Sequence, residues 1–247
     1  MLKGKTMDDQ TTTSVAETEK GFIQRWIDIY FSPQAAYESI DRKPDWIVPL
    51  LVVAIIAAIA AFVLFPVIVQ TQIDQLVDKQ GMSYEDAQQQ VQQTEVFIKY
   101  LGPIGAIIST FVMAFIVAGI FFLVNNHLLG GDSTYKKVLS VYSYTTLGIQ
   151  TVGTIIAVPV MLAKNSFDVP FSPAAFLSSD MKEDFIYKFL AKFDLFTIWM
   201  VVLLIIGFGV IYKFTQGKAA TAVVGLWVIW IFVSIALSSV FGGMFGG

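Results

Sequence analysis

Cysteine is absent from the 247-residue chain, and histidine occurs only once, as His127. Without cysteine the protein has no disulfide, no thiol nucleophile and no thiolate-bound metal. A single histidine argues strongly against a histidine-ligated metal site or a catalytic triad. The sequence also lacks the common motifs GxxxxGK(S/T), HExxH and GxSxG. We therefore predict that the protein is not an enzyme and has no catalytic residue, metal site or cofactor.

Charged residues are also scarce, at 14% of the chain against roughly 25% in soluble domains. Five stretches contain no Asp, Glu, Lys or Arg: 46–73, 100–131, 138–163, 195–212 and 219–247. A membrane-spanning helix needs about 20 consecutive apolar residues, so these stretches exclude an ordinary soluble domain. The net charge of −3 argues against nucleic acid as a partner, because proteins that bind it carry basic surfaces.

The charge-free stretches predict the fold class, an all-α membrane protein with a bundle of five transmembrane helices. The expected spans are about 46–69, 101–127, 138–162, 194–213 and 219–241, within one membrane domain over 46–241. Pro66 should kink or end the first span, because proline removes a backbone hydrogen bond and its ring clashes with the preceding turn.

Two polar segments lie between the spans and predict the extramembrane parts. Residues 70–99 are rich in glutamine, and we expect them to form a short helical pair at about 71–80 and 84–99. Residues 164–192 are expected to form a mixed loop and a short amphipathic helix.

The N-terminal region is predicted to have two parts. Residues 1–21 are polar and should form a disordered cytoplasmic tail. Residues 22–45 should form interfacial amphipathic helices, because the first of them spaces its apolar side chains as a helix face. These side chains are Phe22, Ile23, Trp26, Ile27, Tyr30 and Phe31. At the other end of the chain, residues 242–247 are read as a tail without a structural role.

The distribution of lysine and arginine predicts the orientation in the membrane. Cytoplasmic loops carry the excess of these residues. With the N-terminus inside, the cytoplasmic segments contain ten of them and the outer segments six. We therefore predict a cytoplasmic N-terminus and a C-terminus outside.

Polar side chains follow one face of the third span. Ser143, Thr146, Gln150 and Thr154 are spaced by three or four residues, and lipid cannot satisfy their hydrogen bonds. This polar bundle face could line a path for a solute or could form hydrogen bonds between packed helices. The spacing alone allows both interpretations, and we favour the second.

Two other polar residues stand at the ends of spans. Asp194 begins the fourth span and His127 ends the second. An acidic group inside a membrane suggests a function, and a histidine could relay protons. Because both lie at the edge of a span, we interpret them as interfacial side chains in contact with water or headgroups.

The layout resembles the Yip1 family of five-span membrane proteins, in its prokaryotic branch. Eukaryotic members carry an Asp-Leu-x-Gly-Pro motif at the first span, and Asp45 and Pro49 keep that spacing. A Gly-Tyr-Ser-x-x-Pro motif in the third span is matched by Tyr142-Ser143. The other motif positions differ, with Trp46 and Val48 for Leu and Gly, and Val141 and Thr146 for Gly and Pro.

The resemblance implies a non-enzymatic protein of the prokaryotic cytoplasmic membrane and supplies no catalytic residues. Our first hypothesis is a scaffold or accessory subunit in membrane transport or organisation. Its partners would be the lipid bilayer and another membrane protein or a second copy. The alternative is a small-solute transporter or channel subunit that uses the polar face of the third span. An enzyme acting on lipid is the least favoured hypothesis.

Overall fold

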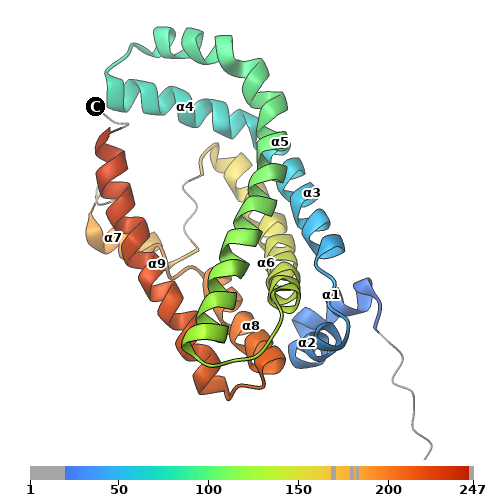
Figure 1. Cartoon of the computed structure of the whole chain (residues 1–247). Helices are drawn as coiled ribbons and strands as arrows, with labels where there is room; N and C mark the ends of the chain where they lie inside the picture. The colour runs from blue at the N-terminus through green and yellow to red at the C-terminus, as the bar shows by residue number, and fades with distance from the viewer. Residues whose placement is uncertain (1–19, 168–170, 179–180, 182–183, 245–247) are drawn as a thin grey trace, which may run out of the picture.

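The computed structural model describes residues 20–167, 171–178, 181 and 184–244, and every regular element among them is helical (Figure 1). The predicted all-α fold class is confirmed. In chain order the elements are α1 (Phe22–Phe31), α2 (Pro33–Arg42), α3 (Ile47–Val63), α4 (Phe65–Gln80), α5 (Tyr84–Leu123), η1 (Val124–Leu128), α6 (Tyr135–Lys164), η2 (Pro173–Phe176), α7 (Phe185–Leu190), α8 (Leu195–Tyr212) and α9 (Gln216–Met244). Here η1 is a π-helix and η2 a 3₁₀-helix.

Four helical segments are long and apolar enough to cross a membrane: Tyr84–Leu128, Tyr135–Lys164, Leu195–Tyr212 and Gln216–Ser238. The bent pair of α3 and α4 supplies a fifth if it acts as one span. The four to five candidate spans agree with the predicted number.

The helix at the predicted first span, α3, ends at Val63, and α4 follows it directly. The chain bends by 61° between α3 and α4, with Leu64 at the break. Pro66 lies just beyond the break, and its missing N–H and bulky ring prevent α3 from continuing. The helix expected at about 71–80 therefore begins earlier, at Phe65.

The second member of the expected extramembrane pair is not a separate helix. It is the first part of α5, which runs unbroken for 40 residues through Pro103. Proline removes only one hydrogen bond of the helix, and packing against a neighbour can offset that loss. Here Ile73 of α4 is buried against Ala87 and Val91 of α5 and holds the first part of α5 in place.

The last spans begin and end close to the predicted positions, and α7 is the short helix expected within 164–192. The predicted tail over 242–247 is helical as far as Met244, because α9 continues to that residue. The remaining residues 245–247, like nearly all of the predicted tail over 1–21, lie outside the described residues.

The connections divide between two ends of the bundle (Figure 1). The α5–α6 connection and the α8–α9 turn lie at one end, next to α2, and the α4–α5 connection lies at the opposite end. Between them, α6 and α8 form the centre of the core, where Tyr144 and Phe208 are fully buried. Helices α1 and α2 form a hairpin, which we call the N-terminal hairpin, and it packs against this centre.

Candidate functional site

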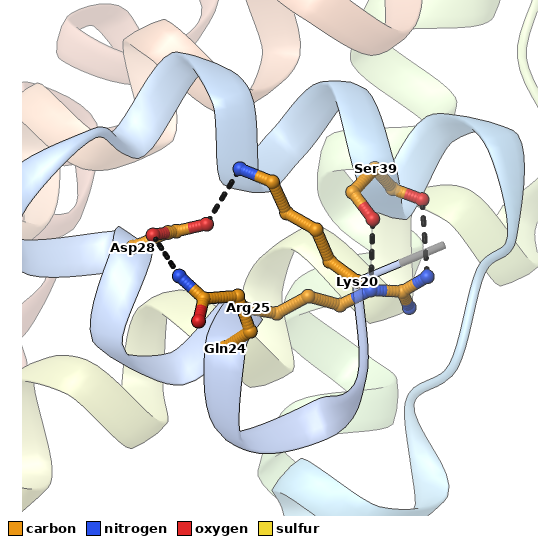
Figure 2. A network of polar contacts seen from close by, with 5 residues as sticks. All are labelled: Lys20, Gln24, Arg25, Asp28 and Ser39. Carbon is orange, nitrogen blue, oxygen red and sulfur yellow. Dashed lines mark hydrogen bonds and ion pairs between the residues drawn. The ribbon is translucent and has the colours of Figure 1, made fainter. Parts of the chain in front are cut away.

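The N-terminal hairpin is held together by a buried arginine. Arg25 of α1 is only 4% exposed. Its guanidinium donates to the Ser39 hydroxyl at 3.0 Å, to the Ser39 carbonyl at 3.2 Å and to the Lys43 carbonyl at 2.8 Å. Figure 2 shows the side chain reaching from α1 to Ser39 on α2. The planar fork of arginine suits this arrangement, because its donors point in fixed directions.

A second group of polar contacts lies within α1 and the residue that precedes it by two positions. Asp28 is buried on α1 and accepts from Lys20 at 2.6 Å and from Gln24 at 2.8 Å. These three side chains meet near Arg25 (Figure 2). The two buried charges of α1 are therefore both satisfied from within the N-terminal region.

Polar contacts also join the hairpin to α6, and we call them the hairpin seam. The Tyr37 and Thr145 hydroxyls lie 2.7 Å apart, and the Tyr30 hydroxyl donates to the Gly148 carbonyl at 2.9 Å. Burial raises the pKa of the Tyr37 hydroxyl above its usual range. Near the start of α6, Lys137 and Asp41 form an ion pair at 2.5 Å. The seam thus follows α6 for about three turns.

Two glycines give the hairpin room to approach the bundle. A Cβ at Gly148 would lie 2.7 Å from a methyl group of Ile29 in α1. A Cβ at Gly207 of α8 would lie 2.5 Å from a methyl group of Val141 and 3.2 Å from the Tyr37 ring. Any larger residue at either position must push its neighbours away.

The apolar face expected on α1 divides into two parts. Phe22, Trp26 and Tyr30 are partly buried, and Phe22 and Tyr30 contact Tyr144 and Trp199 of the bundle. By contrast, Ile23 is 66% and Phe31 81% exposed, with Ile27 between them on the same side. This outward side keeps the apolar character that a helix in the membrane interface requires.

The predicted polar face of α6 lies inside the bundle only in part. Ser143 is fully buried and donates to the Leu139 carbonyl at 2.7 Å. The Thr146 hydroxyl oxygen is buried too. Gln150 and Thr154 are half-buried. The described part of the chain has cavities of about 410, 430 and 400 Å³, and none of these three is lined by any of the four residues.

The structure places the two span-end residues in different roles. Asp194 is the N-cap of α8, and its carboxylate accepts from the backbone N–H groups of Phe196 and Thr197 at 3.0 Å and from the Thr197 hydroxyl. Such a cap satisfies helix N–H groups that would otherwise lack partners. His127 lies in η1 and is exposed, with its ring 6.3 Å from that of Phe122.

The family-motif residues lie near the hairpin and in the core. Asp45 lies between α2 and α3, next to the N-terminal hairpin. Pro49 is buried in the first turn of α3, where proline is well tolerated. On α6, Tyr142 is partly buried next to the fully buried Ser143.

Sequence reasoning missed a polar junction between the two connections at the end of the bundle nearest α2. Asn126 of η1 donates to the Ser133 carbonyl at 2.9 Å and accepts from the Tyr212 hydroxyl at 2.6 Å. A Cβ on Gly131 would lie 2.5 Å from the Tyr212 ring. The only sequence signal was the Asn-Asn pair beside Gly130-Gly131, which indicated a helix end.

Comparisons with known proteins cover nearly the whole described chain. A family model described as the Yip1 domain matches residues 27–238. A curated protein described as membrane protein YknW, from Bacillus subtilis (strain 168), is 30% identical over 216 residues, which cover 85% of this chain and 90% of that relative. No solved structure matches. The matched range includes the hairpin seam.

Proposed function

Because the chain belongs to the Yip1 domain family, we propose that it is a non-enzymatic scaffold or accessory subunit in membrane transport or organisation. The observation that supports this role best is the state of the polar face of α6. Its most buried hydroxyl, on Ser143, donates to its own helix, and none of the three described cavities reaches the face. A solute path would need that face to be wet.

The outer surface of α9 offers a place for a partner. This helix packs on α8 through a narrow buried edge that includes Ala219, Val223 and Ile231. Its other sides expose large apolar groups such as Trp230, at 55%, and Phe232, at 54%. We propose that the partner is another membrane protein or a second copy of this chain, which would replace lipid on this surface.

For the location we propose a prokaryotic cytoplasmic membrane with the N-terminus inside. The basic residues of the α5–α6 connection and of the α8–α9 turn lie at the same end as α2. That arrangement gathers Lys136, Lys137, Lys213 and Lys218 beside the N-terminal region, as the positive-inside rule requires of cytoplasmic segments.

The alternative is a small-solute transporter or channel subunit, which reconstitution tests directly. Liposomes that contain the purified protein should release trapped solutes no faster than protein-free liposomes do. Liposomes with the Gln150→Leu variant should give the same result. Gln90→Leu, on the exposed surface of α5, is the matched control. If the wild-type protein conducts a solute and only Gln150→Leu abolishes the flux, the alternative replaces our proposal.

A second experiment tests the partner. A photo-crosslinking amino acid at Trp230 should form a discrete adduct with a membrane protein or with a second copy of the chain in native membranes. The same group at the fully buried Phe208 is the control and should give no adduct. If the group at Trp230 captures only lipid, α9 is not the partner surface and the scaffold proposal loses its support there.

A further inference from the structure

An open, shallow cavity of about 430 Å³ lies on the surface at the end of the bundle, between α2 and the α8–α9 turn, and most of its polar side chains are exposed. Its lining includes two acidic residues of α2, Glu38 and Asp41, together with Arg42 and Lys213. The volume falls within the range of sites for small molecules. The cavity lies apart from the polar face of α6, and its occupant would go beyond the proposed function.

The charges around this cavity are incompletely paired. Asp41 is neutralised by Lys137 at 2.5 Å. Glu38 accepts a hydrogen bond from Gln34 at 3.0 Å, but among the described residues it has no ion-pair partner within 4.0 Å. Lys213, on the other side of the cavity, likewise has none there. Among the described residues, the Glu38 carboxylate and the Lys213 ammonium therefore line the same space without an ion pair to each other or to a third residue.

The α8–α9 turn holds Lys213 in a fixed backbone position. Lys213 adopts a left-handed conformation with φ of 53° at the end of α8. The rings on either side, Tyr212 and Phe214, stack at 5.1 Å, and the Lys218 ammonium lies 4.1 Å from the Phe214 ring centre. The Tyr212 hydroxyl in turn donates a hydrogen bond to the side-chain oxygen of Asn126 in η1 at 2.6 Å. The contacts of its two neighbours thus fix where the Lys213 side chain leaves the turn.

We propose that this cavity binds the headgroup of a phosphoethanolamine lipid. The lipid ammonium would donate to the Glu38 carboxylate, and its phosphate would accept from the Lys213 ammonium. Lysine is a good point-charge partner for phosphate. The aromatic side chains beside Lys213 are typical of headgroup depth in a membrane.

Two related headgroups fit this lining less well. An anionic glycerol headgroup would bring no positive charge to Glu38 and would leave that carboxylate facing a phosphate. A choline headgroup carries positive charge but has no N–H to donate to Glu38. The lining therefore selects for a headgroup with both a phosphate and a primary ammonium.

Lipid-dependent melting of the purified, delipidated full-length protein tests this site, since a ligand of the native state raises the melting temperature. Short-chain phosphatidylethanolamine should raise it, and equal concentrations of phosphatidylcholine or phosphatidylglycerol should not. Glu38→Gln and Lys213→Gln should each weaken the apparent affinity about tenfold or more, the effect of one lost charge-assisted contact. Glu85→Gln and Lys79→Gln, exposed near the α4–α5 connection, are matched controls.

Each other result overturns the proposal. If phosphatidylcholine stabilises the protein as much as phosphatidylethanolamine does, Glu38 does not accept a hydrogen bond from the headgroup. If phosphatidylglycerol binds more strongly than phosphatidylethanolamine, the cavity is an anion site without selectivity for an ammonium group. Glycerophosphoethanolamine distinguishes the source, because equal stabilisation by this soluble compound means that the ligand is not a membrane lipid. If a variant lowers the melting temperature without lipid, native mass spectrometry of the extracted protein gives a second measure. Unchanged phosphatidylethanolamine adducts in both variants would contradict the proposal.

Discussion

The Tyr37 hydroxyl donates its proton to the Thr145 hydroxyl oxygen across 2.7 Å, linking α2 to α6 over 108 positions of sequence. The direction of the bond follows from a second contact. Thr145 donates its single hydroxyl proton to the Val141 carbonyl at 2.8 Å, so it can only accept from Tyr37. Both side chains are fully buried. The N-terminal hairpin is therefore hydrogen-bonded to the bundle at a site where water cannot compete for the two hydroxyls.

Replacement of this tyrosine tests the hairpin seam. Tyr37→Phe keeps the ring against Gly207 and removes only the donor, which leaves the Thr145 oxygen without its buried partner. We expect the free energy of unfolding to fall by about 1 kcal/mol, the typical cost of one such bond. Denaturant-induced unfolding in detergent micelles measures the change. Tyr84→Phe, at an exposed position, is the control, and equal effects of the two substitutions would contradict a specific bond.

The same tyrosine predicts a loss of stability at alkaline pH. Burial raises the pKa of Tyr37 in the folded protein above its ordinary value of 10.0. The unfolded chain therefore releases this proton from about pH 10 upward while the folded protein keeps it, so stability falls as the pH rises through that window. The free energy of unfolding, measured between pH 8 and 11, should fall less steeply with pH for Tyr37→Phe than for the wild-type protein. An unchanged slope would show that the hydroxyl is accessible to water.

The close approach at Gly148 predicts that a side chain there displaces α1. Gly148→Val places methyl groups where the Ile29 side chain lies, and we expect a loss of about 1–3 kcal/mol from overpacking. Gly119→Val is the matched control, because nothing lies within 4 Å of a Cβ on Gly119. Since the chain has no cysteine of its own, a bismaleimide cross-linker that joins Cys residues introduced at positions 41 and 137 reports hairpin docking. Efficient cross-linking in the Gly148→Val background would contradict this displacement.

We expect that neither alanine nor lysine can replace Arg25 without a loss of stability. Arg25→Ala leaves the Ser39 and Lys43 carbonyls without their buried donor, and we expect a loss of at least about 2 kcal/mol, since hydrogen bonds to charged groups exceed the average. Arg25→Lys keeps the charge but cannot reproduce the fork, so it should recover only part of the loss. Gln34→Ala, exposed on the same hairpin, should stay within about 0.5 kcal/mol. Full recovery by lysine would show that charge alone matters.

The sequence allowed the spans to be predicted because missing charge over about 20 residues is a local property. Helices α6, α8 and α9 begin and end close to the predicted positions. The break at Leu64 was expected from Pro66 for the same local reason. The continuity of α5 through Pro103 was not expected, because a proline near residue 101 resembles the start of a separate helix.

The site was harder to predict than the spans. Periodicity found the apolar face of α1, but it could not show that Tyr30 turns toward the bundle and Phe31 away from it. The hairpin seam depends on pairs such as Tyr37 and Thr145, which no local pattern connects. On α6 the spacing of the polar residues was read correctly from the sequence. Only the structure shows that the Ser143 hydroxyl donates a hydrogen bond to a carbonyl of its own helix.

Cysteine labelling tests the predicted orientation of the bundle. The exposed residues Gln216 of the α8–α9 turn and Gln80 at the end of α4 lie toward opposite ends. Because basic residues gather with α2 at the first end, the positive-inside rule places that end in the cytoplasm. In intact cells that express the Gln80→Cys variant, a membrane-impermeant maleimide should label the protein. With Gln216→Cys, labelling should appear only after the membrane is opened. The reverse pattern would place the N-terminus outside, and labelling of both variants in intact cells would mean that the two ends are not separated by a bilayer.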